Sequence, residues 1–290
     1  MWIVFACGSA LFAGITAVLA KEGIRTTDST VATALRTVVV LAGAWGMVFI
    51  VGSQAELAHL DARSTGLLVL SGLATGASWL CYFKALQLGS VSKVVPIDKL
   101  STVLTVLLAL IFLGERVSLI GALGVVLIAV GTLLMLDADD LRGLPRAVRD
   151  GGGWLLYALG SAFFAALTAI LGKAGITGVE SNLGTAIRTG VVLVMAWVMV
   201  AVTGKLREVR TVPKGELGFV LASGAATCAS WLCYYRALQD GPASVVVPID
   251  KLSVLVTVLF SALVLREAVS RRYLIGLALL VSGVLVMLIR

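Results

Sequence analysis

Charged side chains are scarce in this chain of 290 residues, because Asp, Glu, Lys and Arg make up only 13% of it while hydrophobic residues make up 59%. Ordinary soluble domains carry about 25% charged and about 45–50% apolar residues. The mean hydropathy of +1.05 points the same way. This composition excludes an ordinary soluble domain, and we expect an integral membrane protein surrounded by lipid.

Histidine and paired cysteines are also nearly absent. The one histidine, His59, lies in a polar connector, and none of the four cysteines has the Cys-x-x-Cys spacing of metal or dithiol sites. A histidine-based metal centre or general base therefore has little to build on. The chain also lacks His-Glu-x-x-His, Gly-x-Ser-x-Gly and phosphate-loop motifs. We expect no enzyme activity, no metal and no cofactor.

The net charge of +7 comes from basic residues that are spread through the connectors. A nucleic-acid-binding protein would gather them into one basic domain or stripe. We therefore expect no nucleic-acid partner, and membrane topology explains these charges better.

What the sequence does contain is an internal duplication. Residues 1–138 return as residues 153–290 at a constant spacing, so that Pro96 is matched by Pro248, and 248 − 96 = 152. Close to half of the paired positions are identical without a gap. Because a fixed-period repeat strongly constrains architecture, we expect a first repeat at 1–138, a linker at 139–152 and a second repeat at 153–290.

Each repeat contains apolar stretches of the length needed to cross a membrane, about 20 residues. We therefore predict an all-α membrane protein with ten transmembrane helices, five in each repeat. The spans of the first half are 2–20, 30–51, 65–87, 91–113 and 118–136, and those of the second half lie 152 residues later.

An odd number of helices per repeat turns the second copy upside down relative to the first. The basic residues fit this prediction, because Lys and Arg concentrate in the connectors after helices 1, 3 and 5 of the first half and after helices 2 and 4 of the second. If these connectors lie in the cytoplasm, as the positive-inside rule implies, both termini lie outside.

Ionisable residues within or at the ends of the spans occur in repeat-related pairs, Lys21 with Lys173 and Arg36 with Arg188. A charge inside a span costs about 2.5–3.5 kcal/mol on insertion scales, which makes each a candidate for substrate binding. These cations either face a central cavity and attract an anionic group or extend to the lipid headgroups. The cavity is favoured for the arginines, because a guanidinium a turn or more inside reaches water with difficulty.

The strongest constellation is Val-Val-Pro-Ile-Asp-Lys-Leu-Ser, which occurs at Val94–Ser101 and again at Val246–Ser253. Pro96 and Pro248 each remove a backbone donor and disfavour helix in the preceding residue. We predict that both fourth spans begin with an extended or broken turn. Broken helices at corresponding positions of two halves point to the binding site of a transporter.

An acid and a base follow each proline, as Asp98-Lys99 and Asp250-Lys251. Adjacent helical residues do not face each other, so we expect pairs across the repeats, Asp98 with Lys251 and Lys99 with Asp250. Two interpretations remain open. The pairs are either an ion-pair lock between the halves or include a carboxylate that takes up a proton or holds a cation during transport.

An aromatic face precedes this segment, formed by Trp79, Tyr82 and Phe83 in the first copy and by Trp231, Tyr234 and Tyr235 in the second. Trp and Tyr commonly anchor helices at the membrane interface. The alternative is that these rings line a cavity for an apolar or cationic substrate body.

These features resemble the drug/metabolite transporter superfamily in its ten-helix EamA-type branch. The residues that carry the resemblance are the helix end Tyr82–Gln87, the segment Phe112–Arg116 and the glycine-marked helix Gly124–Leu136, all of which recur in the second copy. The Pro-Ile-Asp-Lys-Leu-Ser segment also resembles short five-helix bacterial and archaeal members, so the chain looks like a fused duplicate of such a unit.

The resemblance implies a carrier with inverted five-helix repeats, a central cavity and alternating access, in a bacterial or archaeal inner membrane. It also implies termini in the cytoplasm, opposite to the charge bias. Family members move amino acids, nucleotide sugars, phosphorylated metabolites or drugs, often as exporters. We expect a secondary active transporter of a small polar or amphipathic metabolite, coupled to protons. The alternatives are a carrier of lipid-linked or amphipathic cationic drugs and a membrane protein with a structural or sensor role.

Overall fold

The computed structural model describes the chain outside residues 89–93, 95–96, 98–99, 136–152, 264–269 and 290. The described part contains helices and connectors and no β-strand. The helices of the first half are α1 (Trp2–Gly23), α2 (Ser29–Val51), the short 3-10 helix η1 (Ser53–His59), α3 (Ala62–Leu88), α5 (Ser101–Phe112) and α6 (Leu119–Leu134). Those of the second half are α8 (Gly153–Gly175), α9 (Ser181–Val202), η2 (Lys205–Arg210), α10 (Lys214–Asp240), α11 (Ala243–Asp250), α12 (Ser253–Leu263) and α13 (Arg271–Leu288).

Within the described ranges, eight helical stretches are long and apolar enough to cross a membrane, and α11 with the first part of α12 forms one of them. Two further apolar helices, α5 and α6, are shorter. Because so many apolar helices cannot be covered by a chain of this size in water, the protein is a multi-pass membrane protein, as the composition predicts.

Helices α2 and α9 begin in the same way, at repeat-related acidic residues. Asp28 accepts hydrogen bonds from the backbone N–H groups of Thr30 at 2.8 Å and Val31 at 3.4 Å. Glu180, 152 positions later, accepts from those of Asn182 at 2.9 Å and Leu183 at 3.0 Å. A carboxylate there satisfies free N–H groups and complements the positive end of the helix dipole.

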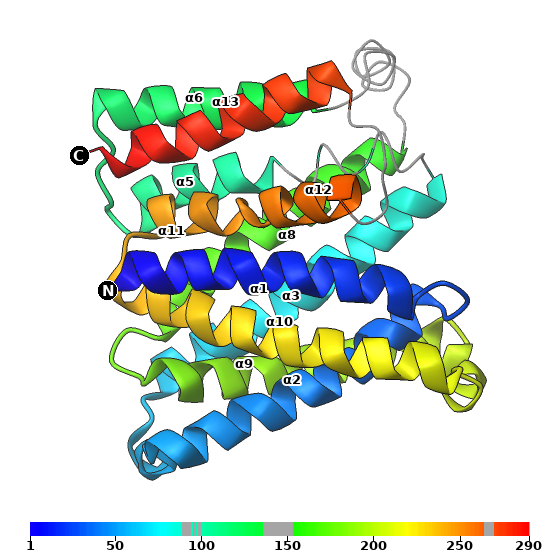
Figure 1. Cartoon of the computed structure of the whole chain (residues 1–290). Helices are drawn as coiled ribbons and strands as arrows, with labels where there is room; N and C mark the ends of the chain where they lie inside the picture. Colours follow the sequence, from blue (N-terminus) through cyan, green and yellow to red (C-terminus); the bar gives the residue numbers. More distant parts are fainter. Residues whose placement is uncertain (89–93, 95–96, 98–99, 136–152, 264–269, 290) are drawn as a thin grey trace.

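The helices pair across the two halves (Figure 1). Helix α1 packs on α10 and α3 packs on α8, which are repeat-related pairs, while α2 packs on its own counterpart α9 and α6 on its counterpart α13. The contacts of α2 with α10 and of α1 with α12 likewise have counterparts in α9 with α3 and α8 with α5. Exchanging the halves therefore leaves these contacts unchanged.

Glycines show how closely α6 and α13 approach each other. A Cβ atom added to Gly131 would lie 2.6 Å from the carbonyl oxygen of Gly276, and one added to Gly124 would lie 2.7 Å from that of Gly283. The earlier residue of α6 lies opposite the later residue of α13, so these counterparts run antiparallel. Small residues permit such backbone contact between membrane helices.

The fourth span of the second half is broken, but not where the sequence predicts. Pro248 lies inside α11, which begins five residues earlier, and the break follows at Lys251 and Leu252. There the chain tightens into hydrogen bonds between residues three apart, from Lys251 N to Pro248 O at 3.1 Å and from Leu252 N to Ile249 O at 2.9 Å. The proline removes only its own N–H from the helix, and the residues before it stay helical. The equivalent Pro96 lies outside the described residues.

Candidate solute-binding site

A cavity of about 250 Å³ lies between the two halves. Helices α1 and α3 of the first half and α8, α9, α10 and α11 of the second all contribute to its wall. The charged side chains of the described lining are Arg188, Asp250 and Lys251. All three are residues that the sequence indicates as candidates, and the fold brings them to one place.

Hydroxyl groups form a polar seam through the apolar helices beside this cavity. Four hydroxyl pairs join the halves, each with its oxygen atoms 3.3 Å apart. The two pairs of serines and the two pairs of threonines are repeat-related, being Ser9 with Ser230, Ser78 with Ser161, Thr16 with Thr227 and Thr75 with Thr168. The Ser78 and Ser230 hydroxyls also donate to the carbonyl oxygens of Ser161 at 3.0 Å and Ser9 at 3.1 Å, and such hydrogen bonds stabilise contacts between membrane helices by about 1 kcal/mol each.

Arg188 is the most deeply buried charge of the site, with 3% of its surface exposed. Its Nε donates to the Ser71 hydroxyl at 3.1 Å and its Nη2 donates to the Thr75 hydroxyl at 2.6 Å. The guanidinium carbon lies 4.8 Å from the ring centre of Trp231 and 4.9 Å from that of Tyr235. Both distances are within the range of cation–π contact.

Asp250 ends α11, immediately before the break. The Ser9 hydroxyl donates to its Oδ1 at 2.6 Å, which joins α1 of the first half to α11 of the second. Hydrogen bonds to a carboxylate of this length are strong. Lys251 follows at the turn and also lines the cavity. Asp98 and Lys99 lie outside the described residues, so the expected pairing across the repeats stays a prediction.

The aromatic candidates divide between cavity and packing. Trp79, Trp231 and Tyr234 line the cavity. Tyr82 instead packs on a separate apolar cluster that includes Ala85. Sequence analysis places Tyr235 in the aromatic face but does not single it out as a site residue, because its counterpart in the first copy is a phenylalanine and the aromatic face alone does not show which ring meets a cation.

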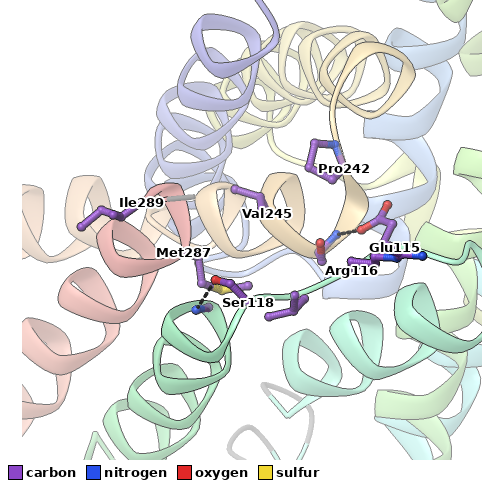
Figure 2. A pocket seen from close by; sticks show the side chains of 10 residues that line it. Glu115, Arg116, Ser118, Pro242, Val245, Met287 and Ile289 are labelled. Atoms are coloured by element: carbon purple, nitrogen blue, oxygen red, sulfur yellow. Dashed lines mark hydrogen bonds between the residues drawn. The ribbon is translucent and has the colours of Figure 1, made fainter.

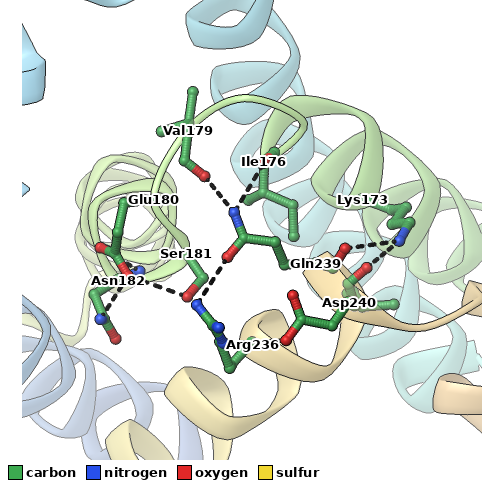
Figure 3. A network of polar contacts seen from close by, with 10 residues as sticks. Lys173, Ile176, Val179, Glu180, Ser181, Asn182, Arg236, Gln239 and Asp240 are labelled. Carbon is green, nitrogen blue, oxygen red and sulfur yellow. Dashed lines mark hydrogen bonds and ion pairs between the residues drawn. The ribbon is translucent and has the colours of Figure 1, made fainter. Parts of the chain in front are cut away.

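Three other basic candidates lie outside the described cavity lining. Lys21 is exposed in the last turn of α1, and Arg36 is half-buried in α2. Lys173 binds the C-terminal end of α10, where its Nζ donates to the carbonyl oxygens of Leu238 and, at 2.8 Å, Gly241 (Figure 3). A cation at a helix C-terminus is favoured by the dipole. We therefore leave these three out of the proposed solute site.

A larger cavity, about 550 Å³, lies at one end of the molecule where the α5–α6 connector meets the start of α11 and the end of α13 (Figure 2). Its ionisable lining residues are Glu115 and Arg116. Glu115 already accepts hydrogen bonds from the backbone N–H groups of Ala243 at 2.7 Å and Ser244 at 2.9 Å. Because that carboxylate caps α11, we favour the smaller central cavity as the solute site.

The seam hydroxyls and Ser71 are the site residues that charge-based reasoning misses. Single serines and threonines are common in membrane helices, so each alone is uninformative. The duplication supplies the missing signal, since each of these residues has an identical counterpart 152 positions away. Polar residues retained in both copies at buried positions of the spans would have indicated the seam.

Comparisons with known proteins agree with this arrangement. The model of the EamA-like transporter family matches residues 1–137 and 152–289. A curated relative from Sinorhizobium sp, named "Uncharacterized transporter in cobO 3'region", is 46% identical over 134 residues, which cover 46% of this chain and 95% of the relative. That relative therefore has about the size of one repeat.

A solved structure titled "Crystal structure of protein" is similar over 97% of this chain and 94% of its own, with 20% identity and a TM-score of 0.72. At that identity the similarity shows a shared fold.

Proposed function

Because the chain belongs to the EamA-like transporter family, we propose that it is a secondary active transporter that moves a small polar or amphipathic metabolite through the central cavity. The resemblance indicated by the sequence motifs is thus confirmed. The observation that carries the proposal is one cavity, lined by both halves, that holds Arg188, Asp250 and Lys251. Charges at membrane depth are costly and mark substrate or ion pathways.

The proposed mechanism is alternating access by two inverted five-helix repeats, ten spans in all. Two observations support it. The main helix pairs are exchanged for one another when the halves are exchanged, and the counterparts α6 and α13 run antiparallel. The N- and C-terminal ends also lie at the same edge of the molecule (Figure 1). Rocking of one repeat against the other would then open the cavity to each side of the membrane in turn.

We propose Asp250 as the proton-coupling group. The described ionisable groups that share its cavity are Arg188, Lys251, Tyr234 and Tyr235. Protonation would remove the only negative charge of this described lining and weaken the charge-assisted bond from Ser9. A solute whose binding depends on that charge would then be coupled to proton uptake and release.

We also propose that the end of the molecule holding the basic connectors faces the cytoplasm of a bacterial inner membrane. The connector after α1 meets the one after α9, because Lys205 forms an ion pair with Asp28 at 2.5 Å. Glu216 accepts from the backbone of Thr26 at 3.1 Å and of Thr27 at 2.9 Å at the same end. The positive-inside rule then places both termini outside.

A proteoliposome assay tests the function. The protein is reconstituted with a pH-sensitive dye inside, a panel of small metabolites is added in turn, and proton movement is recorded. We expect one solute class to drive proton flux in the native protein. Asp250→Asn should abolish the solute-driven flux. The matched control is Asp240→Asn, because Asp240 is exposed at the end of α10 and pairs with Arg236 at 3.3 Å.

Two results would count against the proposal. If no solute in a broad panel moves protons or exchanges across the membrane, the transport function is wrong. If Asp250→Asn behaves like Asp240→Asn, transport stands but the coupling group is wrong.

An amphipathic cation is the second candidate solute, favoured by the aromatic wall of Trp79, Trp231 and Tyr234.

A further inference from the structure

Arg188 has hydrogen-bonding capacity that the described residues leave unused. A guanidinium carries five N–H donors in a planar fork. In Arg188 the Nε and Nη2 atoms have hydroxyl acceptors, whereas Nη1 is buried and has no hydrogen-bond partner within the described ranges. Unpartnered buried donors on a charged group are costly and uncommon. The unused donors therefore point to a ligand.

The acceptors that hold Arg188 are neutral and already oriented. The Ser71 hydroxyl donates its own proton to the carbonyl oxygen of Thr168 at 2.8 Å, and the Thr75 hydroxyl donates to that of Ser71 at 3.0 Å. Both hydroxyls therefore turn a lone pair towards the guanidinium. They fix its position without cancelling its charge, and the rings of Trp231 and Tyr235 beside it carry no formal charge either.

The formal charge of the described part of the cavity lining is positive. Its described lining contains two cations, Arg188 and Lys251, and one anion, Asp250, so the sum is 2 − 1 = +1. Like charges in a poorly hydrated site repel strongly. An anionic group is thus the complement of this cavity, and a carboxylate or a phosphate has the planar or forked oxygen arrangement that a guanidinium binds best.

We propose that Nη1 of Arg188 binds an anionic group, a carboxylate or a phosphate, on the transported solute. The inference rests on the transport function proposed above and specifies its substrate class. The solute's remaining body packs on the aromatic wall of Trp79 and Tyr234. The cavity has a volume of about 250 Å³, whereas sites for drug-sized ligands have volumes of about 300–1,000 Å³. The solute is therefore small and not lipid-linked.

Arg36, the sequence counterpart of Arg188, does not duplicate this site in the present conformation. It lies outside the described cavity lining and is half-buried in α2. The Thr227 hydroxyl repeats the contacts of Thr75, because it donates to the carbonyl oxygen of Ser223 at 2.7 Å and lies 3.3 Å from the Thr16 hydroxyl, so the two halves differ at the arginine and not at these hydroxyls. One anion-binding position per chain follows from this asymmetry.

Small aromatic probes of matched shape and different charge test the proposal. Thermal unfolding of the detergent-solubilised protein is followed with benzoate, phenyl phosphate, benzamide or benzylammonium, each titrated at equal ionic strength. We expect benzoate, phenyl phosphate or both to raise the unfolding temperature by a few degrees, because a ligand of the folded state stabilises it. The uncharged and cationic probes should have no comparable effect. The two anions distinguish a carboxylate from a phosphate site.

Variants assign the effect to Arg188. Arg188→Gln should weaken binding of the effective anion by at least about 10-fold, the equivalent of one charge-assisted hydrogen bond, and Arg188→Lys should give an intermediate loss. Arg236→Gln is the matched control, because it removes an exposed arginine outside the cavity. If Arg188→Gln does not fold, the comparison of charged and uncharged probes on the native protein still decides.

The proposal is overturned if benzamide or benzylammonium stabilises the native protein as much as the anions, if no anion binds, or if Arg188→Gln binds the anion as tightly as Arg236→Gln does. These outcomes are distinct from failure of the transport function. Proton-coupled movement of neutral or cationic solutes in proteoliposomes, without anion binding, would refute only the substrate class.

Discussion

Gly72→Ala tests how the backbone positions Arg188. Gly72 lies on α3 next to Ser71, where a Cβ atom would be 2.7 Å from the Cβ of Val191 and 2.9 Å from the carbonyl oxygen of Arg188. Comfortable carbon–carbon contacts begin near about 3.5 Å, so α3 would have to move away from α9 by about 1 Å. The backbone oxygen cannot be displaced as a flexible side chain can.

That movement is enough to break the hydrogen bonds of the site. The Ser71–Arg188 distance of 3.1 Å would rise to about 4 Å, beyond hydrogen-bonding range. Overpacking costs about 1–3 kcal/mol, while replacing a helical glycine by alanine recovers about 0.5–1 kcal/mol. We expect a net loss of about 1–2 kcal/mol, a few degrees in unfolding temperature, together with weaker anion binding.

Two other glycines provide controls. Gly66→Ala lies on the same helix with nothing within 4 Å, and we expect it to be neutral or slightly stabilising. Gly224→Ala repeats the clash in the other half, 2.8 Å from Val39 and 3.0 Å from the carbonyl oxygen of Arg36. It should destabilise as Gly72→Ala does and retain anion binding. The reasoning is refuted if Gly72→Ala matches Gly66→Ala in both unfolding temperature and anion affinity.

Three further predictions concern the ends of the helices and the connectors between them. Burial alone would raise the pKa of Asp28, but hydrogen bonds from Lys205 and Thr30 and the Lys205 charge together hold that pKa below its ordinary value. Lys205→Gln should therefore cost up to about 1 kcal/mol at neutral pH, and pH-dependent unfolding should show this difference disappearing as Asp28 is protonated below about pH 4. A difference that persists in acid would contradict it. Glu115→Ala, which uncaps α11, should cost about 1–3 kcal/mol, and an unfolding temperature equal to that of the native protein would show that the cap is dispensable. Cysteines at Arg207 and Ala55 should be labelled by an impermeant reagent from the cytoplasmic and the outer face respectively, and the reverse pattern would invert the proposed orientation.

Most of the fold follows from the sequence because its signals are long and repeated. The duplication predicts which helices are equivalent, and apolar length predicts where they lie; α8 and α9, for example, fall on the expected spans. The scarcity of charge in the spans also makes each charged residue informative. Arg188 and Asp250 are candidates on that ground, and both line the cavity.

Features that depend on tertiary contact do not follow in this way. Lys173 sits at the end of a span, where sequence cannot distinguish a cavity-facing cation from one that binds the carbonyl oxygens of another helix. The break after Pro248 is displaced because helix geometry around a proline depends on the packing of its neighbours. Arg36 and Arg188 lie in equivalent sequence segments, yet Arg188 is buried and Arg36 is half-buried, because the two halves pack differently around them.

Access to the central cavity from both faces is the most direct measurement. In a chain whose four native cysteines are replaced, a single cysteine at Ala165, a cavity-lining position, is exposed to an impermeant thiol reagent from one side of sealed vesicles at a time. A cysteine at Ala55, exposed at one end, reports the sidedness of the vesicles. Alternating access predicts labelling of the Ala165 position from each side, slowed from both by benzoate or phenyl phosphate, whichever binds. Labelling from one side only, or at a rate that neither anion changes, would contradict a carrier with an anion site at its centre.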